Sequence, residues 1–191
     1  MDGNAGIARG PESSSTPMGI VLLLTPSLLL GVSFVVLMAA VHYQASEERR
    51  IWSHIGLSFA TVYLTLIGIV YFVQLVLVLP RIMRGELEGI EFLVFVPFDS
   101  FLYAVDILGY SFMSLSTLFA AMAFTGDGLE RIVRRFMIAN GLILPFLVFQ
   151  MYFHPLIWIA SLWAITFPGS TISLWLLFKR KVPKLNRFGA V

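Results

Sequence analysis

The chain has 191 residues, of which 58% are hydrophobic and only 13% are charged. A soluble domain has roughly 45–50% apolar and about 25% charged residues, and a soluble fold has no means of covering apolar blocks as long as these. The absence of cysteine excludes disulfides, thiolate metal sites and cysteine nucleophiles, and a net charge of +2 gives no reason to expect a nucleic-acid partner. The composition predicts an all-α, polytopic transmembrane helical bundle.

Residues 1–17 form a polar tail rich in Gly, Ser and Pro, which we expect to be disordered. The first predicted span covers residues 18–41, with Pro26 as a kink near its start. Its apolar run is too long for a typical signal peptide, and Arg9 is the only positive charge before it. We therefore predict an uncleaved helix.

The second predicted span covers residues 51–79 and ends at Pro80. At 1.5 Å per residue this is about 43 Å, more than the roughly 30 Å of a bilayer's hydrocarbon core, so the helix must tilt or protrude. A loop with charged residues follows, and then the apolar stretch 92–98, which contains Pro97. It is too short to span a membrane, so we interpret it as an interfacial or re-entrant segment.

The remaining three spans are predicted at residues 99–124, 136–153 and 156–178. Residues 129–135 are basic and amphipathic, and we expect them at the membrane surface before the fourth span. The pair Pro168-Gly169 predicts a kink inside the fifth span. Residues 179–191 form a basic tail.

The distribution of Lys and Arg predicts the orientation of the five spans. One side of the membrane holds three such residues: Arg9, Arg81 and Arg84. The other side holds ten: Arg49, Arg50, Arg131, Arg134, Arg135, Lys179, Arg180, Lys181, Lys184 and Arg187. Because positive charge is retained in the cytoplasm, we predict the N-terminus outside and the C-terminus inside, with anionic lipids as partners of the cytoplasmic face.

Asp106 is the strongest chemical lead, because it lies inside the third predicted span. An intramembrane carboxylate costs several kcal/mol by most estimates and is a functional-site hypothesis by default. Helical spacing places Asp99, Tyr103 and Tyr110 on the same face. Gln74 and Gln150 lie at a similar predicted depth in the outer third of their own spans, as do Thr25, Ser27 and Ser161.

Three interpretations of this polar layer remain open. It is interhelical packing, in which Gln and Ser side chains bond to Asp106 and set helix register, with each bond contributing about 0.6 kcal/mol on average. Alternatively it lines an outward-facing site, made of Asp99, Tyr103, Asp106, Tyr110, Gln74 and Gln150, that binds a cation, a proton or an amine. In the third interpretation Asp106 is buried and simply neutral.

Other chemistry is weakly supported. His42 and His54 lie near the ends of adjacent spans, as two haem ligands would, but the pair is more often an interfacial coincidence, and we expect no cofactor and no resident metal. There is no phosphate-binding glycine loop and no G-x-S-x-G nucleophile elbow. Asp99, Asp106 and His154 are the residues that acid–base catalysis would use, although their spacing does not specify it.

Three functions follow as hypotheses. The first is a small transporter or channel-like subunit with a site around Asp106, acting as a homo-oligomer because five spans are few for a monomeric transporter. The second is a structural or interaction subunit that organises a membrane partner. The third is a membrane enzyme acting on a lipid or quinone. In each case we expect a multi-pass protein of a bacterial or archaeal plasma membrane.

Overall fold

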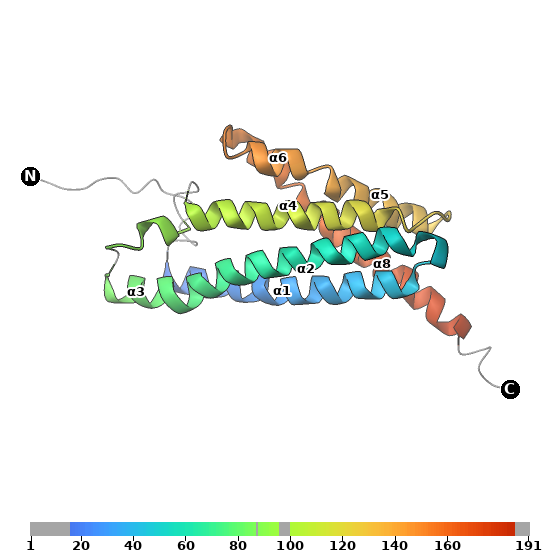
Figure 1. The fold of residues 1–191 in the computed structure, drawn as a ribbon, viewed down its shortest axis with the longest axis horizontal. Helices are drawn as coiled ribbons and strands as arrows, with labels where there is room; N and C mark the ends of the chain where they lie inside the picture. Colours follow the sequence, from blue (N-terminus) through green and yellow to red (C-terminus); the bar gives the residue numbers. More distant parts are fainter. Residues whose placement is uncertain (1–15, 87, 96–99, 186–191) are drawn as a thin grey trace, which may run out of the picture. The chain divides into compact units, whose positions relative to one another are not determined.

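A computed structural model describes residues 16–86, 88–95 and 100–185 of the chain. The regular secondary structure of these residues is helical, without strands (Figure 1). Five helical stretches are long and apolar enough to cross a membrane: Pro17–Gln44, Glu47–Arg84, Phe101–Ala121, Leu129–Phe149 and His154–Arg180. The prediction of an all-α chain with five candidate spans is therefore confirmed.

Among the described residues, eight α-helices and four short elements of other helix types form these stretches and the connections between them. The α-helices are α1 (Pro17–Gln44), α2 (Arg50–Val73), α3 (Leu79–Arg84), α4 (Phe101–Ala121), α5 (Leu129–Gly141), α6 (Leu144–Phe149), α7 (Ile157–Ala160) and α8 (Trp163–Leu185). The short elements are 3₁₀ turns at Glu47–Arg49, Glu91–Leu93 and His154–Leu156, and a π-helical turn at Gln74–Val78.

The second span is longer than its apolar run suggested. Its 38 residues extend about 57 Å at 1.5 Å per residue, because α2 continues through the π-helical turn into α3. Pro80 stands at the start of α3 and does not end the helix. The end comes at Gly85, whose φ of 72° lets its N–H and that of Glu86 bond back to the last turn of α3.

The fourth and fifth spans are interrupted at other places than the sequence indicated. α5 runs through the basic segment and into the apolar one, and the chain turns at Leu142-Ile143. Pro145 has no N–H to bond to the carbonyl of Gly141 four residues back, so the helix does not continue through it. The fifth span turns at Ser161-Leu162, between α7 and α8. Pro168 lies within α8, so the break comes about two turns before the predicted kink.

Some sequence-based expectations fall outside the described residues. These are the polar N-terminal tail, the end of the basic C-terminal tail, and residues 96–99, which include Pro97 and Asp99. The described part of the apolar stretch, residues 92–95, begins inside the 3₁₀ turn at Glu91–Leu93.

The chain divides into two compact units, and α1, α2 and α4 each contribute a segment to both. Unit 1 comprises Met1–Val36 and Thr61–Tyr110, and unit 2 comprises Leu37–Ala60 and Ser111–Val191. Asp106 belongs to unit 1, whereas α5, α6, α7 and α8 belong to unit 2.

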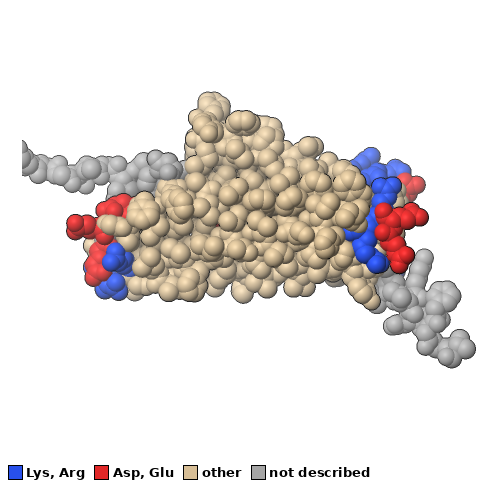
Figure 2. Space-filling model, viewed as in Figure 1, with Lys and Arg blue, Asp and Glu red and all other residues tan. Residues whose placement is uncertain are grey.

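The exposed surface of the spans is largely apolar, as contact with lipid requires. Large hydrophobic side chains such as Leu22, Phe72 and Ile172 are more than half exposed. In unit 2, the charged side chains gather at the turn between α1 and α2 and at the start of α5 (Figure 2). The helices therefore suit a bilayer, with these charges at the ends of the apolar stretches.

Candidate functional site around Asp106

One face of α2 and of the π-helical turn after it is buried in unit 1. Its residues recur at helical spacing, and three of them are polar: Tyr63, Ile67, Val70, Tyr71, Gln74 and Val78. Residues that follow one another at intervals of three or four lie on the same side of a helix. Two tyrosines and a glutamine thereby lie on the inner face of an otherwise apolar span.

The facing segment is the first half of α4. Ser100 precedes the helix, and its hydroxyl accepts a hydrogen bond from the backbone N–H of Tyr103 (3.2 Å), which satisfies one of the donors that a helix start leaves open. Tyr103, Asp106 and Tyr110 follow at spacings of three and four, and Tyr103 and Asp106 are buried. The predicted polar face of the third span is therefore present, without Asp99, which is outside the described residues.

The two segments approach closely because small residues lie between them. A Cβ atom on Gly109 would be 2.9 Å from the Cγ2 atom of Ile67, and one on Gly31 of α1 would be 2.5 Å from its Cδ1 atom. Such contacts are shorter than real Cβ atoms show, so glycine permits both helices to pack against the same residue of α2. This packing brings the tyrosines of α2 against α4.

Asp106 lies within a cluster of tyrosines, which we call the tyrosine cluster: Tyr63, Tyr71, Tyr103 and Tyr110. The hydroxyls of Tyr71 and Tyr110 are 3.1 Å apart and form a hydrogen bond. Tyr71 and the Asp106 carboxyl are also electrostatic neighbours. The rings of Tyr63 and Tyr110 contact each other with centroids 5.7 Å apart, and Phe34 of α1 packs edge-on against Tyr63 at 5.5 Å.

Two polar atoms of this group have no hydrogen-bond partner among the described residues. They are Oδ1 of Asp106, whose residue is 6% exposed, and the hydroxyl oxygen of Tyr63. Within the described ranges the ion pairs are Arg84–Glu86 and Arg131–Asp127, so Asp106 has no cationic partner there. A buried polar group without a partner costs about 1–3 kcal/mol, which a protein retains where the group has another use.

This arrangement can hold a positive charge. The Asp106 carboxyl supplies two oxygens, and tyrosine hydroxyls act both as acceptors and as donors. Aromatic ring faces attract cations as well. The same groups can bind a proton, because a protonated carboxyl becomes a hydrogen-bond donor.

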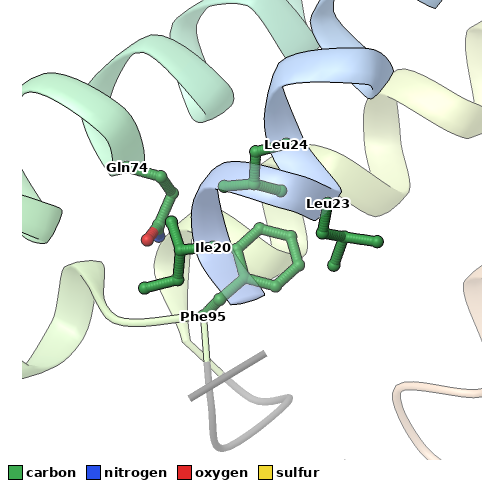
Figure 3. A pocket seen from close by; sticks show the side chains of 5 residues that line it. All are labelled: Ile20, Leu23, Leu24, Gln74 and Phe95. Atoms are coloured by element: carbon green, nitrogen blue, oxygen red, sulfur yellow. The ribbon is translucent and has the colours of Figure 1, made fainter. Parts of the chain in front are cut away.

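Gln74 has a different role from the one that its depth suggested. Its side-chain amide donates a hydrogen bond to the backbone carbonyl of Leu93 (2.6 Å) and so connects the π-helical turn to the segment after α3. Beside it is a small, mainly apolar hollow in which Phe95 points toward α1 (Figure 3), lined by Ile20, Leu23, Leu24, Gln74 and Phe95. Gln74 therefore positions a loop in unit 1.

The other members of the predicted polar layer are not joined to the tyrosine cluster by hydrogen bonds of the described residues. The hydroxyls of Ser27 and Ser161 bond to carbonyls of their own helices, and Thr25 is exposed. Gln150 belongs to unit 2, where it directly follows α6, and its Oε1 atom is buried without a partner among the described residues.

Unit 2 contains a separate polar network that connects three helices. Asn140 of α5 is fully buried (0% exposed); its amide donates to Thr117 of α4 (3.1 Å) and accepts from Thr166 of α8 (2.9 Å). Thr117 also bonds to its own helix, and Ser116 donates to the carbonyl of Gly56 in α2 (2.7 Å). Each hydroxyl and amide in this network has a partner, as expected of interhelical packing.

Sequence reasoning missed Tyr63 and Tyr71 as members of the Asp106 group, and Asn140 as a packing residue. The signal for the tyrosines was their spacing of eight residues in one span, with Gln74 three residues further on the same face. The signal for Asn140 was an amide inside an apolar run.

Comparisons with protein-family models, with curated proteins and with solved structures give no match. The class that the fold defines is a multi-pass membrane protein of five candidate spans, and its chemically distinctive feature is the buried carboxyl of Asp106 among the tyrosines.

Proposed function

We propose that the chain is a small transporter or channel-like subunit that binds a proton or a small cation at Asp106. The observation that carries this proposal is the buried Oδ1 atom of Asp106, which has no partner among the described residues. An ionisable residue within a span is expensive and is typically part of an ion or proton pathway.

The surroundings of Asp106 support a positively charged ligand. The carboxyl has no ion-pair partner in the described residues, while the hydroxyls of Tyr71 and Tyr110 provide oxygens beside it. A proton or a small cation would neutralise the carboxylate and use the vacant acceptor. A ligand of this size needs no large cavity.

The hydrogen-bonded network around Asn140 in unit 2 argues against a purely structural role for Asp106. Where this chain uses a buried amide to hold helices together, at Asn140, both polar ends of the side chain have partners. A residue selected only for packing would be expected to resemble Asn140 rather than Asp106.

The test is ion flux through the purified protein in liposomes, with protons, Na⁺ and K⁺ supplied in turn as an imposed gradient. We expect flux of one of these ions to be lost in Asp106→Asn, since the amide keeps the shape and removes the charge. Thr117→Val is the matched control, because it removes a buried polar group of the same helix outside the tyrosine cluster. Wild-type flux in a folded Asp106→Asn protein would refute the proposal, and lost stability alone would favour the structural hypothesis.

We also propose that the N-terminus lies outside and the C-terminus in the cytoplasm, on the count of three against ten Lys and Arg residues. The chain has no cysteine, so single introduced cysteines report orientation without background. Glu86→Cys and Glu48→Cys replace exposed residues of two different turns. We expect an impermeant thiol reagent on intact cells to label the first and not the second; the opposite labelling would invert the topology.

The exposed arginines at the α1–α2 turn and in α5, among them Arg49, Arg50 and Arg135, support a further proposal that anionic lipids contact this face. We expect the protein to retain added anionic lipid over neutral lipid in detergent. Replacing these three residues with glutamine should remove the preference. The proposed homo-oligomer is tested by cross-linking in the native membrane.

A further inference from the structure

A second cluster of reactive side chains lies in unit 2, and none of them belongs to the tyrosine cluster. His42 is in the last turn of α1 and His54 in the first turns of α2, and their ring centroids are 5.5 Å apart with the planes inclined by 58°. His42 is partly buried and His54 is exposed. The turn between α1 and α2 therefore brings two imidazoles together at the end of a helical hairpin.

The hydrogen bonds of Ser53 define which nitrogen of His42 carries a proton. Ser53 is buried, its hydroxyl donates to the backbone carbonyl of Arg50 (2.9 Å), and its oxygen lies 3.0 Å from Nδ1 of His42. A hydroxyl has one hydrogen, so both bonds form together only if Nδ1 of His42 is the donor. In the neutral ring this leaves the lone pair on Nε2 free.

This is the arrangement in which histidine binds metals. A metal-binding imidazole usually donates its other N–H to an oxygen, which holds the ring in one tautomer and orientation. Ser53 provides that oxygen to His42.

The ring spacing also suits one shared metal ion. With a metal–nitrogen distance of about 2.0–2.1 Å, and the ring centre about 1.1 Å behind the nitrogen, two imidazoles at a tetrahedral angle have centroids about 5 Å apart. The observed centroid distance of 5.5 Å is close to that value. His54 is exposed, so water or an external donor can reach the remaining coordination positions.

We propose that His42 and His54 form a two-histidine site for a divalent transition metal, Cu²⁺, Ni²⁺ or Zn²⁺, the ions that imidazole ligands favour. No group of three or more His, Cys, Asp or Glu side chains placed to hold a metal occurs among the described residues. The site is therefore open and exchangeable, unlike a closed structural zinc site, which has four protein ligands. A bound ion joins the end of α1 to the start of α2 and stabilises that hairpin.

The test uses the full-length protein in detergent, purified through a tag without histidine and titrated with CuCl₂. We expect one saturable Cu²⁺ site whose electron paramagnetic resonance spectrum reports two nitrogen ligands. His42→Ala and His54→Ala should each lower the affinity at least tenfold and leave one nitrogen ligand. Ser53→Ala keeps both imidazoles and removes the orienting oxygen, so a loss of about 10–100-fold is expected, as for other partners of ligating histidines.

His154→Ala is the matched control and should bind as the wild type does, since it removes the third histidine of the chain. Because His54 is exposed, its substitution keeps the test valid even if His42→Ala does not fold. A saturating amount of metal should raise the unfolding temperature of the wild type and not that of His54→Ala. Binding that survives both substitutions, or that never saturates, would mean an adventitious ion only and overturn the proposal.

Discussion

Two sets of buried polar side chains in this chain differ in how completely they are hydrogen-bonded, although unit 2 also holds a buried Oε1 atom of Gln150 without a partner among the described residues. In unit 2, Asn140 has both ends of its amide bonded to neighbouring helices, and Ser116 and Thr117 bond to helix carbonyls. In unit 1, Asp106 and Tyr63 each present a buried oxygen without a partner among the described residues. Both sets are contributed by long apolar helices, so the difference does not come from the type of element.

In a membrane bundle, the completeness of a polar side chain's hydrogen bonds helps to distinguish a packing role from a functional one. A polar side chain that holds helices together gains free energy only when its hydrogen bonds are complete, and even then each contributes about 0.6 kcal/mol on average. A buried polar side chain whose hydrogen bonds are incomplete lowers stability and is retained for another reason. The unit 2 network therefore provides an internal reference for the tyrosine cluster of unit 1.

The largest expected effect is at the contact between α2 and α4 in unit 2. A Cβ atom on Gly56 would lie 2.8 Å from the backbone oxygen of Ser116 and 2.9 Å from Cβ of Ala120, so the two helices must separate. We expect Gly56→Ala to lower the unfolding free energy by about 1–3 kcal/mol, as overpacking does. The measurement is unfolding in detergent micelles.

Gly68→Ala is the control for that substitution, because the same helix offers open space around this Cβ. We expect it to be neutral or to raise stability by up to about 1 kcal/mol, the helix preference of alanine over glycine. Equal losses in both variants would show that the effect comes from helix propensity and not from the close α2–α4 contact.

The second effect tests the network itself. Asn140→Ala removes hydrogen bonds to Thr117 and Thr166, and we expect stability to fall by about 1–2 kcal/mol. Thr166→Val removes one of the two bonds and should cost about half as much. The same unfolding assay measures both, and an Asn140→Ala protein as stable as the wild type would remove the reference on which the comparison of the units rests.

The third effect has the opposite sign and lies in the tyrosine cluster. Tyr63→Phe deletes a buried hydroxyl that has no partner among the described residues, so we expect stability to rise by about 1 kcal/mol. Tyr71→Phe deletes the hydroxyl bonded to Tyr110 and should lower stability by about 0.6 kcal/mol.

Paired unfolding measurements of these two variants check the signs. A loss of stability in Tyr63→Phe as large as that in Tyr71→Phe would mean that the Tyr63 hydroxyl is held like the groups of unit 2. In that case the tyrosine cluster would be part of the helix packing, and its contrast with the Asn140 network would disappear.

The polar face of α4 could be predicted from sequence because it lies on one helix, where spacing alone places Tyr103, Asp106 and Tyr110 together. Tyr63 and Tyr71 could not be assigned to it, since the pairing of two helix faces depends on contacts such as those of Gly109 with Ile67. That Oδ1 of Asp106 has no partner among the described residues was also beyond prediction, because it requires knowledge of every neighbouring side chain.

The same limit applies to the spans. Five apolar blocks were readable from composition and length, and the turn before Pro145 has a local cause. The turn at Ser161-Leu162 has no proline or glycine next to it, so local signals did not indicate it. The bonds of Asn140 join residues 23 and 26 positions away, a separation at which sequence spacing carries no information.

The smallest effect is expected at an exposed pair, which gives the baseline for both buried sets. Arg84 and Glu86 are 3.0 Å apart at the end of α3, and the hydrogen bond from Arg84 holds the pKa of Glu86 below its ordinary value. A lowered carboxyl pKa contributes stability that is present above the ordinary range of glutamate and is lost as the pH falls through the lowered value. Because water and salt screen exposed charges, we expect Glu86→Gln to leave the unfolding temperature unchanged within error at pH 7 and at pH 3. A clear drop in the unfolding temperature at pH 7 that vanishes at pH 3 would show that this ion pair stabilises the fold. Exposure alone would then not distinguish the polar groups that stabilise this chain from those that do not.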